Sequence, residues 1–349
     1  MISFIVPAHN EQSCIGRTLQ AIHATAGVVG QPHEMIVVDD ASTDATADIA
    51  RQHKATVLSV NHRQIAAARN AGVRVARGDR LFFVDADTTV NSDVVKSALR
   101  WMDKGAAGGG ALARFDGPVP LYARLLILWM GFFMRLAGLS GGACMFCTRN
   151  AFQAVGGFDE CLYGAEDAAM SSALKREGRF VVVWPRVVTS GRRVRTMPGL
   201  QVLRGLMRMA FFPSRMLTQR SQVQEIWYNS ARQDDERMPG TLAARLSNAI
   251  ALSILLVLVT TPIWIVPWPR TLTAGPLGSI RFGAKIILAH MGLVLWPCAF
   301  LLSRSLLHQR RWRERFKLMV LIGLSLWFAC TSTVGVYWTW KPLYHWLAQ

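Results

Sequence analysis

Charged side chains are scarce in this chain, and acidic ones are scarcer than basic ones. Only 17% of the 349 residues are Asp, Glu, Lys or Arg, whereas 51% are hydrophobic. This composition excludes a disordered chain and is high in apolar residues for a purely soluble enzyme. The 39 Lys and Arg against 22 Asp and Glu give a formal net charge of +17. Such a charge is typical of proteins that meet nucleic acid, anionic lipid or a phosphorylated substrate.

Cysteines and cofactor fingerprints are also sparse. The six cysteines are scattered, and no secretory signal precedes the first apolar run, so we expect a reducing cytosol around the N-terminal part. Cys144 and Cys147 have the spacing of a metal-binding pair but lack a second pair, so we expect small buried apolar residues there. The turn at residues 7–11 has no glycine, and no P-loop spacing occurs. Hydride-transfer enzymes and P-loop NTPases are therefore disfavoured, and no motif indicates nucleic-acid binding.

Three long uncharged runs account for much of the apolar excess. We expect transmembrane helices at about 246–268, 286–303 and 318–340, because each run of roughly 18 or more residues is long enough to cross a bilayer. Tryptophans stand at the run ends, where an aromatic belt belongs. Buried core helices are the alternative, but three consecutive uncharged runs are too many for one soluble core.

The loop between the second and third runs predicts the orientation. It carries Arg304, Arg310, Arg311, Arg313, Arg315 and Lys317 against Glu314 alone. The positive-inside rule places this loop in the cytosol. Three spans then leave a cytosolic domain at residues 1–230 and a membrane domain at 231–349 whose C-terminus lies outside. The sequence therefore predicts an integral protein of the cytoplasmic membrane.

Two further stretches, residues 121–139 and 199–217, mix apolar side chains with arginines. Such stretches are typical of helices that lie in the membrane interface, with arginines directed toward lipid headgroups. Ordinary amphipathic core helices are the alternative.

Residues 1–185 alternate strand and helix patterns. Short, fully apolar runs between amphipathic stretches predict an α/β fold with a mainly parallel sheet. The expected strands are Ile2–Val6, Met35–Val38, Ala55–Val60, Leu81–Val84 and Phe180–Trp184. The expected helices are Ile15–Ala26, Thr43–His53, Ile65–Ala76 and Ser92–Lys104. Polar residues follow several of the strands, where ligands bind in such sheets.

Four stretches give the chain a resemblance to the family 2 glycosyltransferases. They are residues 5–11 (IVPAHNE), 37–44 (VVDDASTD), 67–72 with 83–87 (AARNAG and FVDAD), and 156–160 with 164–167 (GGFDE and GAED). Their order and spacing match the family over about residues 2–195. The resemblance implies a nucleotide-sugar-binding domain of the GT-A fold, followed here by interfacial and transmembrane helices.

Asp85 and Asp87 stand one residue apart at a strand end, where two carboxylates can reach a metal ion and a nucleotide together. Mg²⁺ or Mn²⁺ suits oxygen ligands and neutralises charge on a departing diphosphate. By resemblance, Asp87 binds the metal directly, and Asp85 binds the ribose or a metal-bound water. A solvated acidic turn is the alternative. The donor contacts that the resemblance implies are Pro7, Ala8, Glu11, Asp40, Arg69, Asn70, Asp85 and Ala86.

Arg192 and Arg193 follow the last expected strand. Arginine suits phosphate because its planar fork donates two hydrogen bonds, so the pair is a candidate clamp for the donor diphosphate. A contact with lipid headgroups is an equal alternative.

Glu166 and Asp167 open another expected helix. The resemblance assigns the general base of an inverting transfer to Asp167 and leaves Glu166 to orient the acceptor or the helix turn. Acidic residues also favour helix N-termini for electrostatic reasons, which is the alternative. Ala169 stands where the family often has a further Asp.

The expected function is transfer of a single sugar from a nucleotide-sugar donor to a lipid-linked or membrane-proximal acceptor. Residues 309–312 read Gln-Arg-Arg-Trp, one spacer short of the Gln-x-x-Arg-Trp motif of processive polysaccharide synthases, and three spans are few for a polymer channel. A processive synthase and a non-catalytic nucleotide-sugar-binding scaffold on the same fold remain the alternatives.

Overall fold

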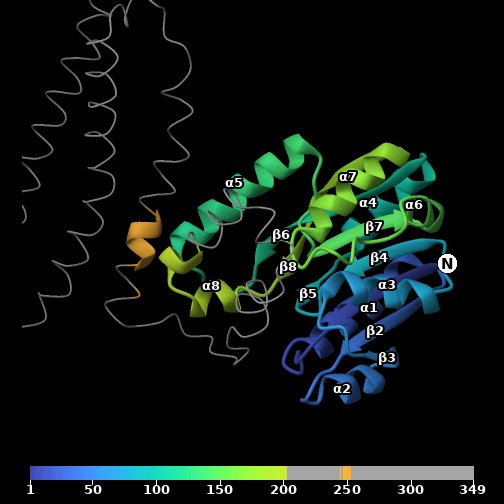
Figure 1. The fold of residues 1–349 in the computed structure, drawn as a ribbon, viewed down its shortest axis with the longest axis horizontal. Coiled ribbons are helices and arrows are strands. Elements are labelled where there is room, and N and C mark those ends of the chain that lie inside the picture. The colour runs from blue at the N-terminus through green and yellow to red at the C-terminus, as the bar shows by residue number, and fades with distance from the viewer. Residues whose placement is uncertain (203–243, 245–246, 253–349) are drawn as a thin grey trace, which may run out of the picture. The chain divides into compact units, whose positions relative to one another are not determined.

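The computed structural model describes residues 1–202, 244 and 247–252 (Figure 1). The strands are β1 Ile2–Ala8, β2 His33–Asp40, β3 Thr56–Val60, β4 Arg80–Val84, β5 Thr88–Thr89, β6 Ala106–Phe115, β7 Cys144–Thr148 and β8 Arg179–Thr189. The helices are α1 Ile15–Val29, α2 Thr46–Gln52, α3 Ile65–Val75, α4 Ser92–Asp103, α5 Leu121–Ala137, α6 Arg149–Ala154, α7 Glu166–Glu177 and α8 Arg192–Thr196.

The predicted membrane segments fall largely outside these residues. Of the three expected spans, only residues 247–252 are described, and most of 199–217 lies outside as well. Within the described part of the chain, no helix is both long enough and apolar enough to cross a bilayer.

The eight strands of the described residues belong to one sheet, in the order β3-β2-β1-β4-β7-β6-β8-β5. β1, β2, β3 and β4 run parallel, and so do β6 and β8. β7 runs antiparallel to β4 and β6, and the short β5 antiparallel to β8. The predicted α/β fold is confirmed, with a mixed sheet that is parallel over its N-terminal half.

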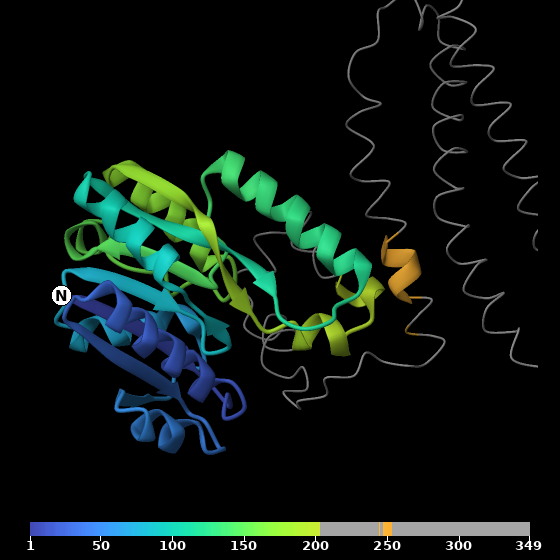
Figure 2. The same ribbon diagram turned by 180° about the vertical axis from the view of Figure 1, so that it is seen from behind.

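Helices cover both faces of the sheet (Figures 1 and 2). Alternate residues of a strand point to opposite faces, and β1 buries both sets. Phe4 and Val6 pack in a cluster with α1 and α4, whereas Ile5 packs with α3, α6 and α7. The sheet is therefore the middle of three layers, which explains why the strands read as continuous apolar runs.

The structure adds a glycine-rich strand, β6, that the apolar pattern of the sequence does not predict. A Cβ atom on Gly109 would lie 2.1 Å from the carbonyl oxygen of Val181, and one on Gly110 would lie 1.9 Å from Ser140 Oγ. Glycine is required here because neighbouring backbone and side chains approach so closely. A pattern that counts apolar side chains cannot find a central strand built this way.

The chain falls into two compact units. The first includes residues 1–119 and 127–196, and so holds the sheet. The described residues of the second are 120–126, 197–202, 244 and 247–252. Within the second unit, Gly199 N donates to Asn248 Oδ1 at 2.9 Å.

Candidate active site

The carboxyl ends of the parallel strands meet at one edge of the sheet. Among the described residues, five non-glycine residues have positive φ, and four of them lie in turns around this edge: Asn10, Ala41, Arg63 and Ala165. A left-handed backbone costs a non-glycine residue about 1–3 kcal/mol, and such residues cluster at functional sites. This edge is therefore the candidate active site.

Arg69 on α3 joins two carboxylates that come from different elements. Its guanidinium is 2% exposed; Nη2 donates to Asp85 Oδ1 at 2.9 Å, and Nη1 donates to Glu166 Oε1 at 2.8 Å. Nη2 also donates to the carbonyl oxygen of Gly142 at 3.2 Å. These bonds give Arg69 a positional role, because they fix the turn after β4 relative to the start of α7. Its expected contact with the donor stays a prediction.

Glu166 and Asp167 take different environments from the first turn of α7. Glu166 is buried, and burial raises its pKa to about 7, with Arg69 opposing the rise and Asp167 adding to it. Asp167 is half-buried; its Oδ2 accepts from Gly142 N at 2.5 Å and its Oδ1 from Ala168 N at 2.7 Å. Glu166 is thus engaged by a guanidinium and Asp167 is oriented by backbone amides.

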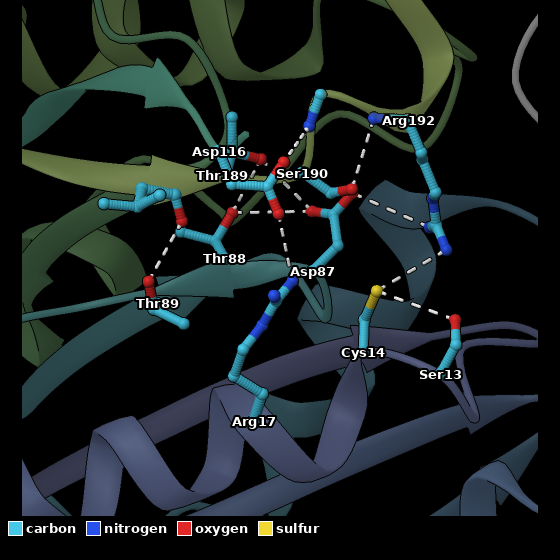
Figure 3. Close-up of polar contacts among 12 residues, drawn as sticks. Ser13, Cys14, Arg17, Asp87, Thr88, Thr89, Asp116, Thr189, Ser190 and Arg192 are labelled. Atoms are coloured by element: carbon cyan, nitrogen blue, oxygen red, sulfur yellow. Dashed lines mark hydrogen bonds and ion pairs between the residues drawn. The ribbon is translucent and has the colours of Figure 1, made fainter. Parts of the chain in front are cut away.

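Asp87 lies between two threonines and an arginine (Figure 3). Its Oδ1 accepts from Thr189 Oγ1 at 3.3 Å and from Thr88 Oγ1 at 3.5 Å. Its Oδ2 lies 3.6 Å from Nη2 of Arg192, which is buried and forms a closer ion pair with Glu11. Glu11 therefore holds a buried positive charge beside Asp87.

Asp116, at the end of β6, is a site residue that sequence reasoning missed. Its Oδ1 accepts from Gly191 N at 2.7 Å and Arg195 Nη1 at 3.1 Å, and its Oδ2 from Arg17 Nη2 at 3.3 Å (Figure 3). Although burial opposes it, these bonds hold the pKa of Asp116 below its ordinary value. Asp116 thereby anchors the turn into α8, the helix that carries both Arg192 and Arg193. No local pattern links positions so far apart in sequence.

Two further expected donor contacts hold backbone segments in place. Asp40 accepts from the amides of residues 62–64, at 2.7, 2.8 and 3.0 Å. The Asn70 side chain donates to the carbonyl oxygen of Phe158 and accepts from its amide, both at 2.9 Å. Both side chains therefore shape the site through the turns that they bind, and their contact with a donor stays a prediction.

Pro7, Ala8 and Ala86 are buried beneath the same edge. The carbonyl oxygen of Ala86 accepts from Thr18 Oγ1 at 2.8 Å, which ties the Asp85–Asp87 turn to α1. Pro7 and Ala8 thus end β1, and Ala86 follows β4, at the candidate active site.

The turn from Asp85 to Asp87 suits an oxygen-preferring divalent cation. The two side chains are 31% and 18% exposed, so both carboxylates are partly accessible, and carboxylate oxygen is the ligand that Mg²⁺ prefers. Among the described residues, no group of three or more His, Cys, Asp or Glu side chains comes together in metal-binding proximity. A bound ion would therefore complete its coordination with oxygens of the donor and water.

Cys144 and Cys147 lie on β7 and are fully buried. Burial raises the pKa of Cys144 to about 12 and raises that of Cys147 as well. Their prediction as buried apolar residues is confirmed.

Residues 3–160 match the family model of Glycosyl transferase family 2. The poly(ribitol-phosphate) beta-glucosyltransferase of Bacillus spizizenii is 32% identical over 107 residues, which cover 29% of this chain and 16% of that protein. The succinoglycan biosynthesis protein ExoO of Rhizobium meliloti is 33% identical over 116 residues, which cover 32% of each.

An undecaprenyl-phosphate 4-deoxy-4-formamido-L-arabinose transferase of Edwardsiella ictaluri is 28% identical over 112 residues, which cover 30% of this chain and 34% of that protein. The chain thus spans between 16% and 34% of the length of these three relatives. The residues that match the family model, 3–160, include β1 to β7.

Proposed function

We propose that this chain, whose residues 3–160 form a glycosyltransferase family 2 domain with the GT-A fold, moves one sugar from a nucleotide-sugar donor to a lipid-linked or membrane-proximal acceptor. The observation that carries the proposal is the link from Asp85 through Arg69 to Glu166. This link joins the candidate metal turn to the start of α7, the helix that carries the candidate base Asp167, at the edge of the sheet where a donor and an acceptor would meet.

On the donor side, Asp87 and Asp85 would hold Mg²⁺ or Mn²⁺, which supplies positive charge against the departing diphosphate. Arg192 places a second positive charge beside the same turn, because its Nη2 lies 3.6 Å from Asp87 Oδ2. Because Arg192 is buried, its position supports a diphosphate clamp over a lipid contact.

Small residues and held turns would form the rest of the donor pocket. Pro7, Ala8 and Ala86 would lie beneath the nucleotide, since all three are buried at the sheet edge. Asp40 and Asn70 would shape its walls through the backbone that they bind.

On the acceptor side, Asp167 would act as general base. The acceptor hydroxyl oxygen bonds to the anomeric carbon, the bond from that carbon to the diphosphate oxygen breaks, and the hydroxyl proton passes to Asp167. Attack opposite the leaving diphosphate inverts the anomeric carbon. Glu166 is less suited, because it is buried and its carboxylate already pairs with Arg69.

A membrane setting is supported by the three uncharged runs after residue 245 and by the relative named for undecaprenyl phosphate. The basic loop 304–317 supports a cytosolic catalytic domain and an outside C-terminus. A reporter fused after Gln349 should therefore be active outside the cytosol. Reporter activity in the cytosol would contradict the arrangement with three transmembrane helices.

Mass spectrometry of lipid-linked glycans, from cells with and without the chain, tests the acceptor. We expect a product that carries one added sugar and depends on the chain. A polymeric product would instead support a processive synthase. Binding of nucleotide sugar without turnover of any donor would support a non-catalytic scaffold.

A further inference from the structure

One side of α5 exposes a row of large apolar side chains. Leu128, Phe132 and Leu136 follow one another at intervals of four residues and therefore share a helix face. They are 51%, 65% and 74% exposed, and Trp184 of β8 is 80% exposed. We call these four residues the apolar patch.

The side of α5 that points away from the apolar patch is apolar and buried at Ala123 and Leu126. Gly131 is buried, and a Cβ atom there would lie 3.3 Å from the Leu112 side chain of β6. A helix that is apolar on its buried side normally presents polar residues to water. The apolar patch therefore occupies the side of α5 on which a helix exposed only to water would carry polar or charged residues.

Two arginines lie at or near the apolar patch. Arg135 donates to the carbonyl oxygen of Val183 at 2.7 Å, and its guanidinium lies 3.9 Å from the centre of the Trp184 ring. Burial lowers the pKa of Arg135, and the charge of Arg186, exposed on the same strand as Trp184, lowers it further. Helix α5 has no acidic residue at all.

We propose that the apolar patch lies against an anionic lipid bilayer and orients the catalytic domain on it. Leucine and phenylalanine side chains insert at the acyl boundary, tryptophan favours the headgroup level, and arginines meet anionic headgroups. A second copy of the chain fits less well, because it would bring Arg135 and Arg186 against their own like charges. The inference deepens the proposed function, since it names the surface that would face a membrane acceptor.

Photocrosslinking of the full chain in proteoliposomes tests this surface. Leu136→p-benzoylphenylalanine places a photoreactive ring in the apolar patch, and Val28→p-benzoylphenylalanine is the matched control on α1, where Val28 is 61% exposed. In vesicles of phosphatidylcholine with phosphatidylglycerol, we expect a lipid adduct at position 136, seen by mass spectrometry, and none above background at position 28. The adduct at position 136 should decrease when phosphatidylcholine replaces the anionic lipid.

Other products would overturn the proposal. A crosslinked dimer would show that a second copy covers the apolar patch, and an internal crosslink would show that another segment of this chain does. Equal lipid adducts at both positions would show only general proximity to the vesicle. Release of nucleoside diphosphate, measured in the same samples, separates this inference from the proposed function: an active chain without a lipid adduct at position 136 contradicts only the inference.

Discussion

Arg69 and Asp85 form a largely buried ion pair in which Arg69 Nη2 lies 2.9 Å from Asp85 Oδ1. The same guanidinium bonds Glu166 through its other terminal nitrogen. The turn expected to bind metal and the helix expected to carry the base are therefore fixed to one side chain. Arg69 would therefore hold the expected metal turn and the expected base helix at a fixed separation.

Replacing Arg69 should strongly destabilise the fold. Arg69→Met leaves two carboxylates without their cation, and loss of one partner from a buried pair costs about 3–5 kcal/mol. Arg17→Met is the control, because the Arg17 side chain is 54% exposed in its pair with Asp116, and exposed pairs contribute about 1 kcal/mol or less. Unfolding followed by tryptophan fluorescence in detergent measures both. Equal losses in the two variants would show that the Arg69 bonds do not stabilise the fold.

The pH dependence of the free energy of unfolding should reveal the raised pKa of Glu166. Its pKa in the folded chain is raised to about 7, above the value of about 4.3 for an ordinary glutamate. Between these two pKa values, the folded state keeps a proton on Glu166 that the unfolded state releases. The stability that Glu166 contributes through this proton is therefore complete below about pH 4 and is lost as the pH rises through about 7. We expect the Tm of the wild type to fall relative to Glu166→Gln between about pH 5 and 8.

Glu177→Gln is the matched control for that series, because Glu177 is exposed at the other end of α7. Its Tm should follow the wild type across the range. A constant difference between wild type and Glu166→Gln at every pH would contradict the raised pKa.

Two adjacent glycines should differ sharply in their tolerance of a methyl group. A Cβ atom on Gly142 would lie 2.9 Å from Arg69 Nη2 and 3.3 Å from Asp167 Oδ2, whereas one on Gly141 would meet only Met134, at 3.4 Å or more. Gly142→Ala should therefore displace the site and reduce kcat by about tenfold or more, on the scale expected when catalytic groups are misplaced. Gly141→Ala should remain near wild type. Similar kcat values for the two variants would show that this close approach is not needed.

Asp167→Asn tests the assignment of the base. It nearly keeps the shape of the side chain and removes its basicity, so kcat should fall by roughly a hundredfold or more while the Kd for the donor stays near normal. Glu166→Gln should reduce kcat less, because Glu166 acts through Arg69. Near-normal kcat in Asp167→Asn together with a collapse in Glu166→Gln would transfer the role of base to Glu166.

The sequence predicts the helices and strands that have a clear local pattern. Every expected strand and helix of residues 1–104 is present, since each is a short apolar or amphipathic run between turns. It missed β6, where glycines replace apolar side chains because neighbours approach too closely. It also missed Asp116 and the pairing of Glu11 with Arg192, because these contacts join distant segments and leave no local pattern. Local motifs therefore indicate individual candidate residues, whereas the contacts of those residues with distant segments require the fold.

The most direct test of the central claim is release of nucleoside diphosphate by the purified chain in native lipid, measured across a panel of nucleotide sugars. With Mg²⁺ or Mn²⁺ present, at least one donor should be consumed. Excess chelator should abolish release, and Asp87→Asn should reduce it by about a hundredfold or more, because the leaving diphosphate loses several kcal/mol of charge stabilisation. Asp93→Asn, at an exposed position of α4, should leave it unchanged. Full release in chelator, full release by Asp87→Asn, or no release from any donor would contradict the account.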